Sequence, residues 1–172
     1  MTAPNLEADL EREHRHGFAW AVHCCRGDRV EAEDVLHLAY EKILVGRARF
    51  DGRSAFRTWL FGVIRRTAWE ERRRRLLRRL RLMEWVARRS QVDDGAPDPS
   101  AIAVAADATR RLETALASLS GRQREMMHLV FYQDQSIQEA AEILGLPVGT
   151  ARTHYERGKT RLRRLLRVLE EK

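Results

Sequence analysis

The stretch Ser136–Leu166, SIQEAAEILGLPVGTARTHYERGKTRLRRLL, predicts two helices separated by a tight break. Ser136 offers a hydroxyl that suits a helix start, and apolar residues then recur at helical spacing as far as Leu144. Gly145 ends the first helix because glycine accepts the left-handed cap conformation, and Pro147 suits the start of the second. The stretch therefore predicts a helix-turn-helix, whose second helix enters the major groove of DNA.

The second helix of this unit has one apolar and one polar face. Ala151, Tyr155 and Leu162 continue the apolar stripe. The residues expected at the DNA are Pro147, Gly149, Thr150, Arg152, Thr153, His154 and Arg157. An ordinary helical hairpin with a polar outer face is the alternative, and the rest of the chain decides between the two.

Composition favours an all-α protein of one or two domains. The chain has 172 residues, 44% of them hydrophobic, which is enough for a packed core. It holds only 4 prolines and 10 glycines, and regular strand alternation is hard to find. Apolar residues at helical spacing recur instead.

Charge is distributed unevenly around a net value of +7. Residues 1–45 hold 9 acidic side chains against 5 basic ones, whereas residues 65–89 hold 11 arginines against 3 glutamates. An acidic segment and a basic segment in one small protein indicate two different partners, with a polyanion on the basic side.

Cys24 and Cys25 are adjacent, so they do not form an ordinary structural disulfide. Their spacing with His14, His16 and His23 matches no standard zinc pattern, and we expect no metal and no cofactor. Neither a signal peptide nor an apolar run of about 18 residues is present. A reducing, cytoplasmic setting without membrane insertion is expected.

Two helices are predicted in the N-terminal segment, over Leu6–Cys25 and Glu31–Gly46. The polar side of the second carries Glu33, Asp34, His37 and Glu41. These carboxylates fit either a solvated helix start, where acids favour the positive dipole end, or a surface that docks a partner.

A long helix is predicted after the loop Arg49–Ser54, with Ser54 as its cap. Its first half is apolar on much of its circumference, as in the middle of a bundle. Its second half is rich in arginine, with Leu76, Leu77 and Leu80 between the charges. Solvated helices usually mix Glu with Arg, so this one-sided excess favours contact with phosphates.

The segment Gln91–Pro99 breaks all periodicity and marks a domain boundary. We therefore predict two small helical domains, over residues 1–90 and 100–172, joined by a flexible linker over residues 91–99. The second domain should begin with a helix over Ser100–Ser118 and continue with one over Ser120–Gln133. In the latter, the side chains expected to face inward are Met126, Leu129, Val130 and either Phe131 or Tyr132.

With these residues in view, the chain resembles the extracytoplasmic-function (ECF) sigma factors, which are specificity subunits of bacterial RNA polymerase. Ala32–Ile43 resembles the polymerase-binding helix of that family. Phe50–Arg75 resembles the loop and helix that bind the minus-ten promoter element, and Leu119–Leu166 the domain that binds the minus-thirty-five element. The three stretches occur in the family's order and spacing.

The resemblance implies partners and roles for individual residues. Core RNA polymerase would be bound through its clamp coiled coil and its flap, and an anti-sigma factor is an expected regulator. The clamp-binding residues would be Glu33, Asp34, His37 and Glu41. The residues at the minus-ten element would be Phe50, Asp51, Gly52, Arg53, Ser54, Ala55, Arg57, Arg65, Arg66, Arg72 and Arg73. The loop would hold a base flipped out of the melted strand.

Other functions explain less of the chain. A stand-alone helix-turn-helix regulator that binds an operator as a dimer shares the C-terminal motif but leaves Ala32–Arg75 unexplained. An RNA-binding or anti-sigma-controlled adaptor would use the arginine-rich helix alone. An enzyme fits least, because the sequence shows no phosphate-cradling glycine loop and no nucleophile elbow.

Overall fold

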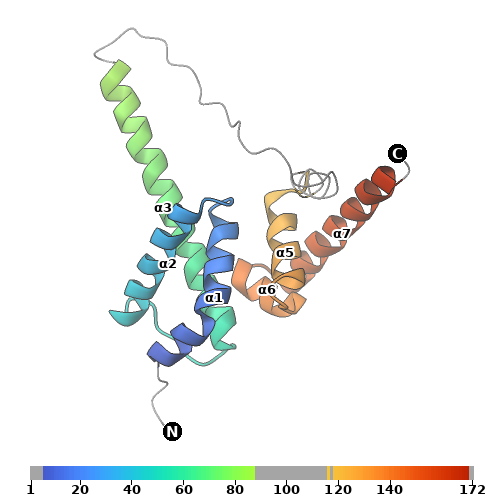
Figure 1. The fold of residues 1–172 in the computed structure, drawn as a ribbon, viewed down its shortest axis with the longest axis horizontal. Coiled ribbons are helices and arrows are strands. Elements are labelled where there is room, and N and C mark those ends of the chain that lie inside the picture. The colour runs from blue at the N-terminus through green and yellow to red at the C-terminus, as the bar shows by residue number, and fades with distance from the viewer. Residues whose placement is uncertain (1–5, 88–115, 117, 171–172) are drawn as a thin grey trace.

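The fold was analysed in a computed structural model, which describes residues 6–87, 116 and 118–170. These residues form helices and no strand, so the predicted all-α fold is confirmed. The linker predicted over residues 91–99 and most of the helix predicted over Ser100–Ser118 lie outside the described residues. The helices are α1 (Leu6–Cys24), α2 (Arg29–Leu44), α3 (Phe56–Ala87), α5 (Gly121–Phe131), α6 (Ile137–Leu144) and α7 (Val148–Glu170) (Figure 1).

Helices α1, α2 and α3 pack around an apolar core. Trp20 is fully buried, and its indole N–H donates to the carbonyl oxygen of Phe61 at 3.0 Å. Gly17 lets α1 approach its neighbours closely, because a Cβ there would lie 3.3 Å from Cδ1 of Ile64. The other large buried side chains of this core are Leu10, Val35, Leu36, Ile43, Leu60 and Val63.

Helix α2 begins two residues earlier than the sequence pattern predicts, at Arg29 rather than Glu31. The reason is a cap that the pattern did not reveal: the side chain of Asp28 accepts a hydrogen bond from the backbone N–H of Glu31 at 2.9 Å. The helix ends at Leu44, two residues before the predicted Gly46.

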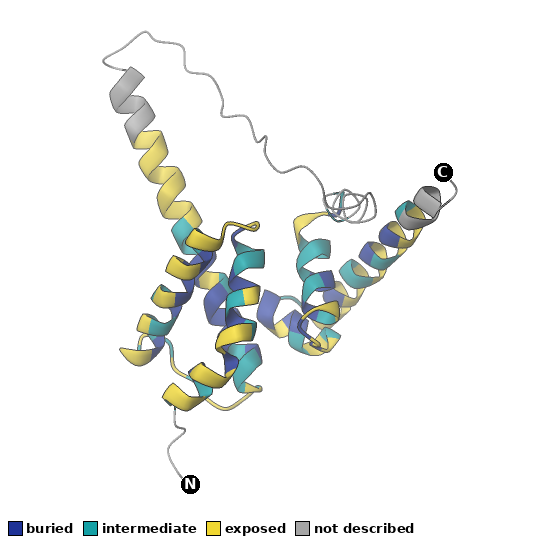
Figure 2. Cartoon of the chain, viewed as in Figure 1, coloured by how far each residue is buried: buried dark blue, intermediate teal, exposed yellow. Residues whose placement is uncertain are grey.

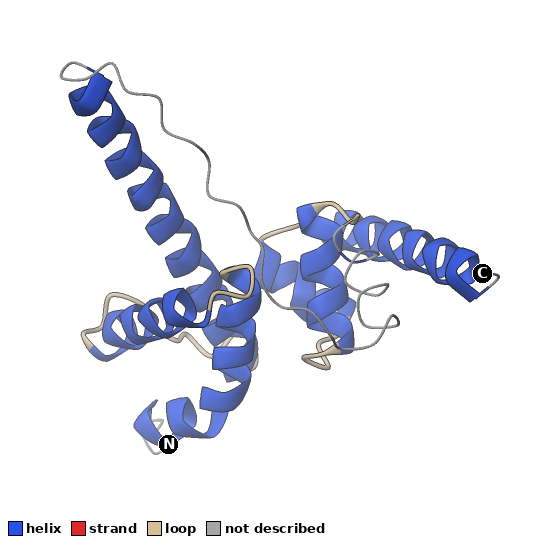
Figure 3. Ribbon diagram, turned by 45° about the horizontal axis from the view of Figure 1, so that its top comes forward, coloured by secondary structure: helices blue, strands red, loops and turns tan. Residues whose placement is uncertain are grey.

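Helix α3 differs along its length, as the burial colours of Figure 2 show. Its first turns are buried from Leu60 to Ala68 apart from two arginines, while Leu76, Leu77 and Leu80 are exposed on the part that projects from the bundle (Figure 3). The predicted cap at Ser54 is wrong, because the helix begins at Phe56 and Ala55 supplies the first carbonyl acceptor, for Trp59 N–H at 3.1 Å.

Helices α5, α6 and α7 form the predicted helix-turn-helix unit. Ser120 and Ser136 each complete a capping box, with Gln123 and Glu139 respectively, at the starts of α5 and α6. Gly145 ends α6 at φ 64° and ψ 41°, in the left-handed conformation that its position predicts. The helices can then cross closely over small residues, since Ala140, Ala141 and Ala151 are all buried.

One prediction about α5 is wrong. Met126 and Leu129 face the core as expected, but Phe131 and Tyr132 are 56% and 66% exposed. Both rings lie against other aromatic rings at the surface instead: Phe131 stacks on Tyr155, with centroids 6.1 Å apart. An aromatic pair at the surface thus replaces a core contact.

The two helical units contact each other directly. Helix α6 packs against α3, and one buried cluster extends through both units. Inside this contact, the hydroxyl of Thr58 donates to Oε1 of Gln135 at 3.2 Å, and both residues are buried. No helix of the described residues has the length and apolar character needed to cross a bilayer.

Candidate nucleic-acid and polymerase interfaces

The N-terminal half of α7, here called the recognition helix (Val148–Arg157), exposes most of its predicted DNA-facing residues. Arg152 and Arg157 are exposed and sit five residues apart on a helix whose opposite side is anchored by the buried Ala151. Such arginines have the donor geometry for paired hydrogen bonds to guanine. The other exposed members of the predicted set are Pro147, Gly149, Thr150 and Thr153.

Three side chains of the recognition helix differ from this exposed, basic set. The Thr153 hydroxyl donates to the carbonyl oxygen of Gly149 at 3.0 Å, so it is engaged within its own helix. His154 is only half-exposed and lines a cleft between the two helical units. Glu156, an acid near this face, pairs with Lys159 at 3.1 Å, which offsets its repulsion of phosphate.

The loop before α3 has a fixed aromatic base and an exposed tip. Phe50 lies with its ring centroid 5.4 Å from Phe56 and 5.3 Å from Trp59. At the tip, Gly52 has φ 74°, and the backbone N–H of Arg53 donates to the carboxylate of Asp51 at 3.2 Å. The loop is therefore a shaped turn beside an aromatic cluster, in which Asp51, Gly52, Arg53 and Ala55 are exposed and Ser54 is half-buried.

The arginines predicted to bind the minus-ten element divide into two groups. Arg66 and Arg73 are exposed, and the Arg73 guanidinium lies 5.9 Å from the centroid of the Trp69 ring. Arg57, by contrast, forms a two-point ion pair with Glu13, at 2.6 and 3.4 Å. Arg57 is therefore bound within the N-terminal bundle.

The remaining two predicted arginines reach across to other elements. Arg65 on α3 pairs with Glu125 on α5 at 2.9 Å, with both side chains about one-fifth exposed. Arg72 donates to the backbone carbonyl of Cys24 at 2.5 Å while its side chain stays exposed.

Helix α2 presents the predicted polymerase-binding residues together. Glu33, His37 and Glu41 follow at intervals of four residues, and all three are exposed, as is Asp34 beside them. The opposite side of the helix is buried in the core. Asp34 lies at the 4.0 Å limit of an ion pair with Arg75, so the row is largely open to solvent.

A contact between α1 and α5 was not predicted from the sequence. His23 and His128 stack with their ring centroids 4.0 Å apart, and Trp20 lies 5.3 and 5.5 Å from the two rings. Burial, and then the charge of Arg124, lower the pKa of His23 to about 4. Burial, and then His23, lower the pKa of His128 to about 3. Both rings are therefore neutral at pH 7.

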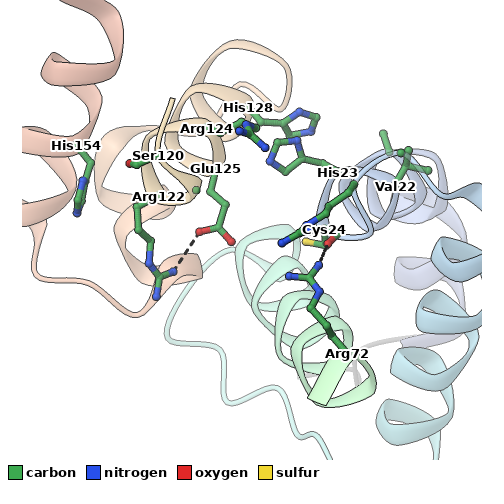
Figure 4. A pocket seen from close by; sticks show the side chains of 14 residues that line it. Val22, His23, Cys24, Arg72, Ser120, Arg122, Arg124, Glu125, His128 and His154 are labelled. Carbon is green, nitrogen blue, oxygen red and sulfur yellow. Dashed lines mark hydrogen bonds and ion pairs between the residues drawn. The ribbon is translucent and has the colours of Figure 1, made fainter. Parts of the chain in front are cut away.

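A cleft of about 840 Å³ opens beside this histidine contact, between the two helical units (Figure 4). Arg72 and Cys24 line one side, while Arg122 and Glu125, joined by an ion pair at 3.1 Å, line the other. His154 extends the cleft to the recognition helix. The cleft thus brings together side chains from both surfaces that the sequence assigns to DNA.

Family models match both halves of the chain. Residues 10–78 match Sigma-70 region 2, and residues 109–162 match Sigma-70 region 4. The ECF RNA polymerase sigma factor SigX of Bacillus subtilis (strain 168) is 31% identical over 147 residues, covering 84% of this chain and 75% of that protein. The chain belongs to the ECF sigma factor family. SigW of the same organism is 27% identical over 148 residues, covering 83% of this chain and 79% of that protein.

Solved structures of sigma factors share the fold of this sigma factor. RpoE in complex with the anti-sigma factor NepR from Bartonella quintana superposes with a TM-score of 0.69 at 24% identity, covering 96% of this chain and 99% of that one. CnrH in complex with the cytosolic domain of CnrY superposes with a TM-score of 0.61 at 23% identity, covering 96% and 91%. The two family matches confirm the predicted fold class of two small helical domains, and these structures share that fold.

The adjacent cysteines of the sigma factor lie in surroundings that disfavour the thiolate. Burial raises the pKa of Cys24 well above its usual range, and burial also raises that of Cys25 to about 11. Both thiols are therefore protonated at neutral pH, and the thiolate is the form that reacts or binds metal. Among the residues that the structure describes, no group of three or more His, Cys, Asp and Glu could hold a metal ion.

Proposed function

We propose that this sigma factor docks on core RNA polymerase through α2 and reads two promoter elements, one with each domain. The observation that carries the proposal is the separation of three exposed surfaces on one chain: the acidic row of α2, the loop before α3 and the recognition helix. Each surface has the chemistry that its partner requires. A dimeric operator-binding regulator would use only the third.

The docking surface is the row of Glu33, His37 and Glu41 with Asp34 beside it. Its negative charge keeps it apart from DNA and suits a basic protein partner, for which the clamp coiled coil of core polymerase is our candidate. The C-terminal domain would contact the flap of the polymerase. Residues 1–90 and 100–172 would be the two domains, with 91–99 as the linker.

The loop Phe50–Ala55 would receive one base of the minus-ten element. Stacking on an aromatic side chain is worth about 1–3 kcal/mol per base, which offsets part of the cost of removing the base from the duplex. Phe56 and Trp59 build the aromatic base of the loop together with Phe50. Arg66 and Arg73 are exposed on the following helix and would hold the strand by its phosphates.

The recognition helix would read the minus-thirty-five element in the major groove, with Arg152 and Arg157 as the main base-reading candidates. The sigma factor would act in the cytoplasm and would itself catalyse no reaction. An anti-sigma factor would hold it inactive when the genes that it transcribes are not needed.

In vitro transcription with core polymerase on fragmented genomic DNA tests this proposal, with the start sites mapped. We expect a small set of starts that share upstream elements and that require both proteins. Arg152→Ala should reduce these transcripts by about 5- to 150-fold, equivalent to 1–3 kcal/mol of base discrimination. Arg15→Ala removes another exposed arginine, on α1 and outside the three surfaces, and should leave transcription unchanged. Tight operator binding without polymerase would contradict the proposal.

A further inference from the structure

The contact between the two domains contains a pair of titratable side chains, which a pH-dependent conformational switch requires. We propose that the stacked pair His23–His128 is a pH-responsive latch, in which protonation of the rings shifts the protein toward separated domains and exposes the surfaces between them. The structural part of this inference concerns the free protein alone. Its consequence for transcription rests on the proposed function.

The buried, stacked geometry of the pair favours neutral rings. The ring planes are inclined by 26° with centroids 4.0 Å apart, and Trp20 packs against both rings. The side-chain amide of Gln133 is close enough to hydrogen-bond to His128, since its Nε2 lies 3.3 Å from Nε2 of the ring. A positive charge on either ring would lose hydration in this contact, and charges on both would repel each other at short range.

Among the described residues that line the cavities beside the pair, no carboxylate is free to stabilise such a charge. Two cavities lie beside the pair: the interdomain cleft, whose cationic lining residues are Arg26, Arg72, Arg122 and Arg124, and a second cavity between α5 and α7. The cationic residues that line the second cavity are Arg124, Lys159 and Arg163. The other titratable groups that line the two cavities are His154, Cys24 and Tyr132. Glu125 is the one carboxylate among these lining residues, and both Arg65 and Arg122 already bind it. Protonation therefore weakens the closed arrangement.

In the closed arrangement, residues that the proposed function needs at DNA lie at the contact between the domains. Arg65, assigned to the minus-ten element, is held by Glu125 of the other domain, and His154 of the recognition helix faces the interdomain cleft. The names of the two promoter elements, minus ten and minus thirty-five, place them about 25 base pairs apart. At about 3.4 Å per base pair, this separation is about 85 Å. Opening would release Arg65 from Glu125, uncover His154 and let the two DNA-reading surfaces move apart along the promoter.

The direction and size of the pH effect follow from proton linkage. Both histidine pKa values are lowered in the closed form, so the closed form is favoured above the ordinary pKa of about 6.5 and loses stability as pH falls below it. If both rings regain the ordinary value on opening, the ratio of open to closed molecules rises about 100-fold between pH 7.5 and 5.5. Between pH 7.5 and 6.5 the rise is about threefold.

Small-angle X-ray scattering of the full-length protein, without polymerase or DNA, tests the latch. The radius of gyration should increase from pH 7.5 to pH 5.5 in the wild type while helix content by circular dichroism stays constant. Glu125→Arg sets the open reference, because it places like charges opposite Arg65 and should expand the protein at both pH values. His16→Gln, a histidine on the same helix α1, serves as the matched control and should behave as the wild type.

The non-titrating variant His23→Phe/His128→Phe keeps ring stacking and should remain compact at both pH values. His23→Gln/His128→Gln should also lose the pH response, whether it is compact or expanded at pH 7.5. A wild type that is as expanded as Glu125→Arg at pH 7.5, a wild type that stays compact at pH 5.5, or a Phe pair that expands on acidification would each overturn the proposal. Since the readout involves no transcription, these outcomes leave the promoter-binding proposal untouched, and the reverse also holds.

Discussion

The ion pair between Glu13 and Arg57 makes a quantitative prediction about which residues stabilise the N-terminal domain. Glu13→Gln removes the charge while keeping the size of a side chain that is 11% exposed and bound at 2.6 and 3.4 Å by Arg57, itself 32% exposed. Breaking a buried pair costs about 3–5 kcal/mol, and an exposed pair contributes less than about 1 kcal/mol. The intermediate burial places the loss at about 2 kcal/mol, which corresponds to a fall in Tm of about 4–8 °C for a chain of this size.

Thermal unfolding followed by circular dichroism at pH 7 measures this loss. Glu11→Gln, an exposed acid on the same helix, is the matched control and should melt within about 1 °C of the wild type. Combining Glu13→Gln with Arg57→Gln should cost less than the two single changes added together, because each removes the same interaction. A Tm for Glu13→Gln equal to that of the control would refute the assignment of Arg57 to a structural pair.

Three further predictions follow from single positions. Gly145→Ala should destabilise the C-terminal unit by about 1 kcal/mol in chemical unfolding, because its φ of 64° strains a residue with a Cβ, whereas Gly121→Ala, at an open helix start, should be neutral. Leu129→Ala deletes a fully buried side chain and should cost about 2–5 kcal/mol of the free energy of unfolding; a loss below 1 kcal/mol would contradict its place in the core. Alkylation of Cys25 by iodoacetamide should accelerate as pH rises toward a pKa of about 11 rather than 9. At pH 8 the folded protein should therefore react at least about 100-fold more slowly than the unfolded chain, because burial of the thiol adds to its lower thiolate fraction. Mass spectrometry of timed samples measures that rate, and equal rates in the two states would exclude a raised pKa.

Local patterns in the sequence predicted most of the secondary structure. Capping residues and helical periodicity located Ser120, Ser136 and Gly145 at helix ends, where the structure has them. The errors also occur at helix ends. Asp28 caps α2 from the segment between the two predicted N-terminal helices, and Ser54 lies one residue too early to cap α3. A side chain that can cap does so only where the backbone presents free N–H groups to it, and this depends on how the loop is packed.

The exposed surfaces were predictable for a related reason. Glu33, His37 and Glu41 share one side of a helix whose other side is apolar, so amphipathic spacing alone determines that they face solvent. The same reasoning predicted exposure for Arg152 and Arg157. It did not separate Arg57 from Arg66, because an ion pair with a residue 44 positions away leaves no periodic signal.

The sequence by itself therefore determined the all-α class, the helix-turn-helix and the three charged or aromatic stretches that associate the chain with ECF sigma factors, because these depend on residues close together along the chain. Only the tertiary structure decided that Glu125 would hold Arg65 and that His23 would stack on His128. These contacts join residues 60 and 105 positions apart, and their stability comes from burial and charge pairing between domains, which no local pattern encodes.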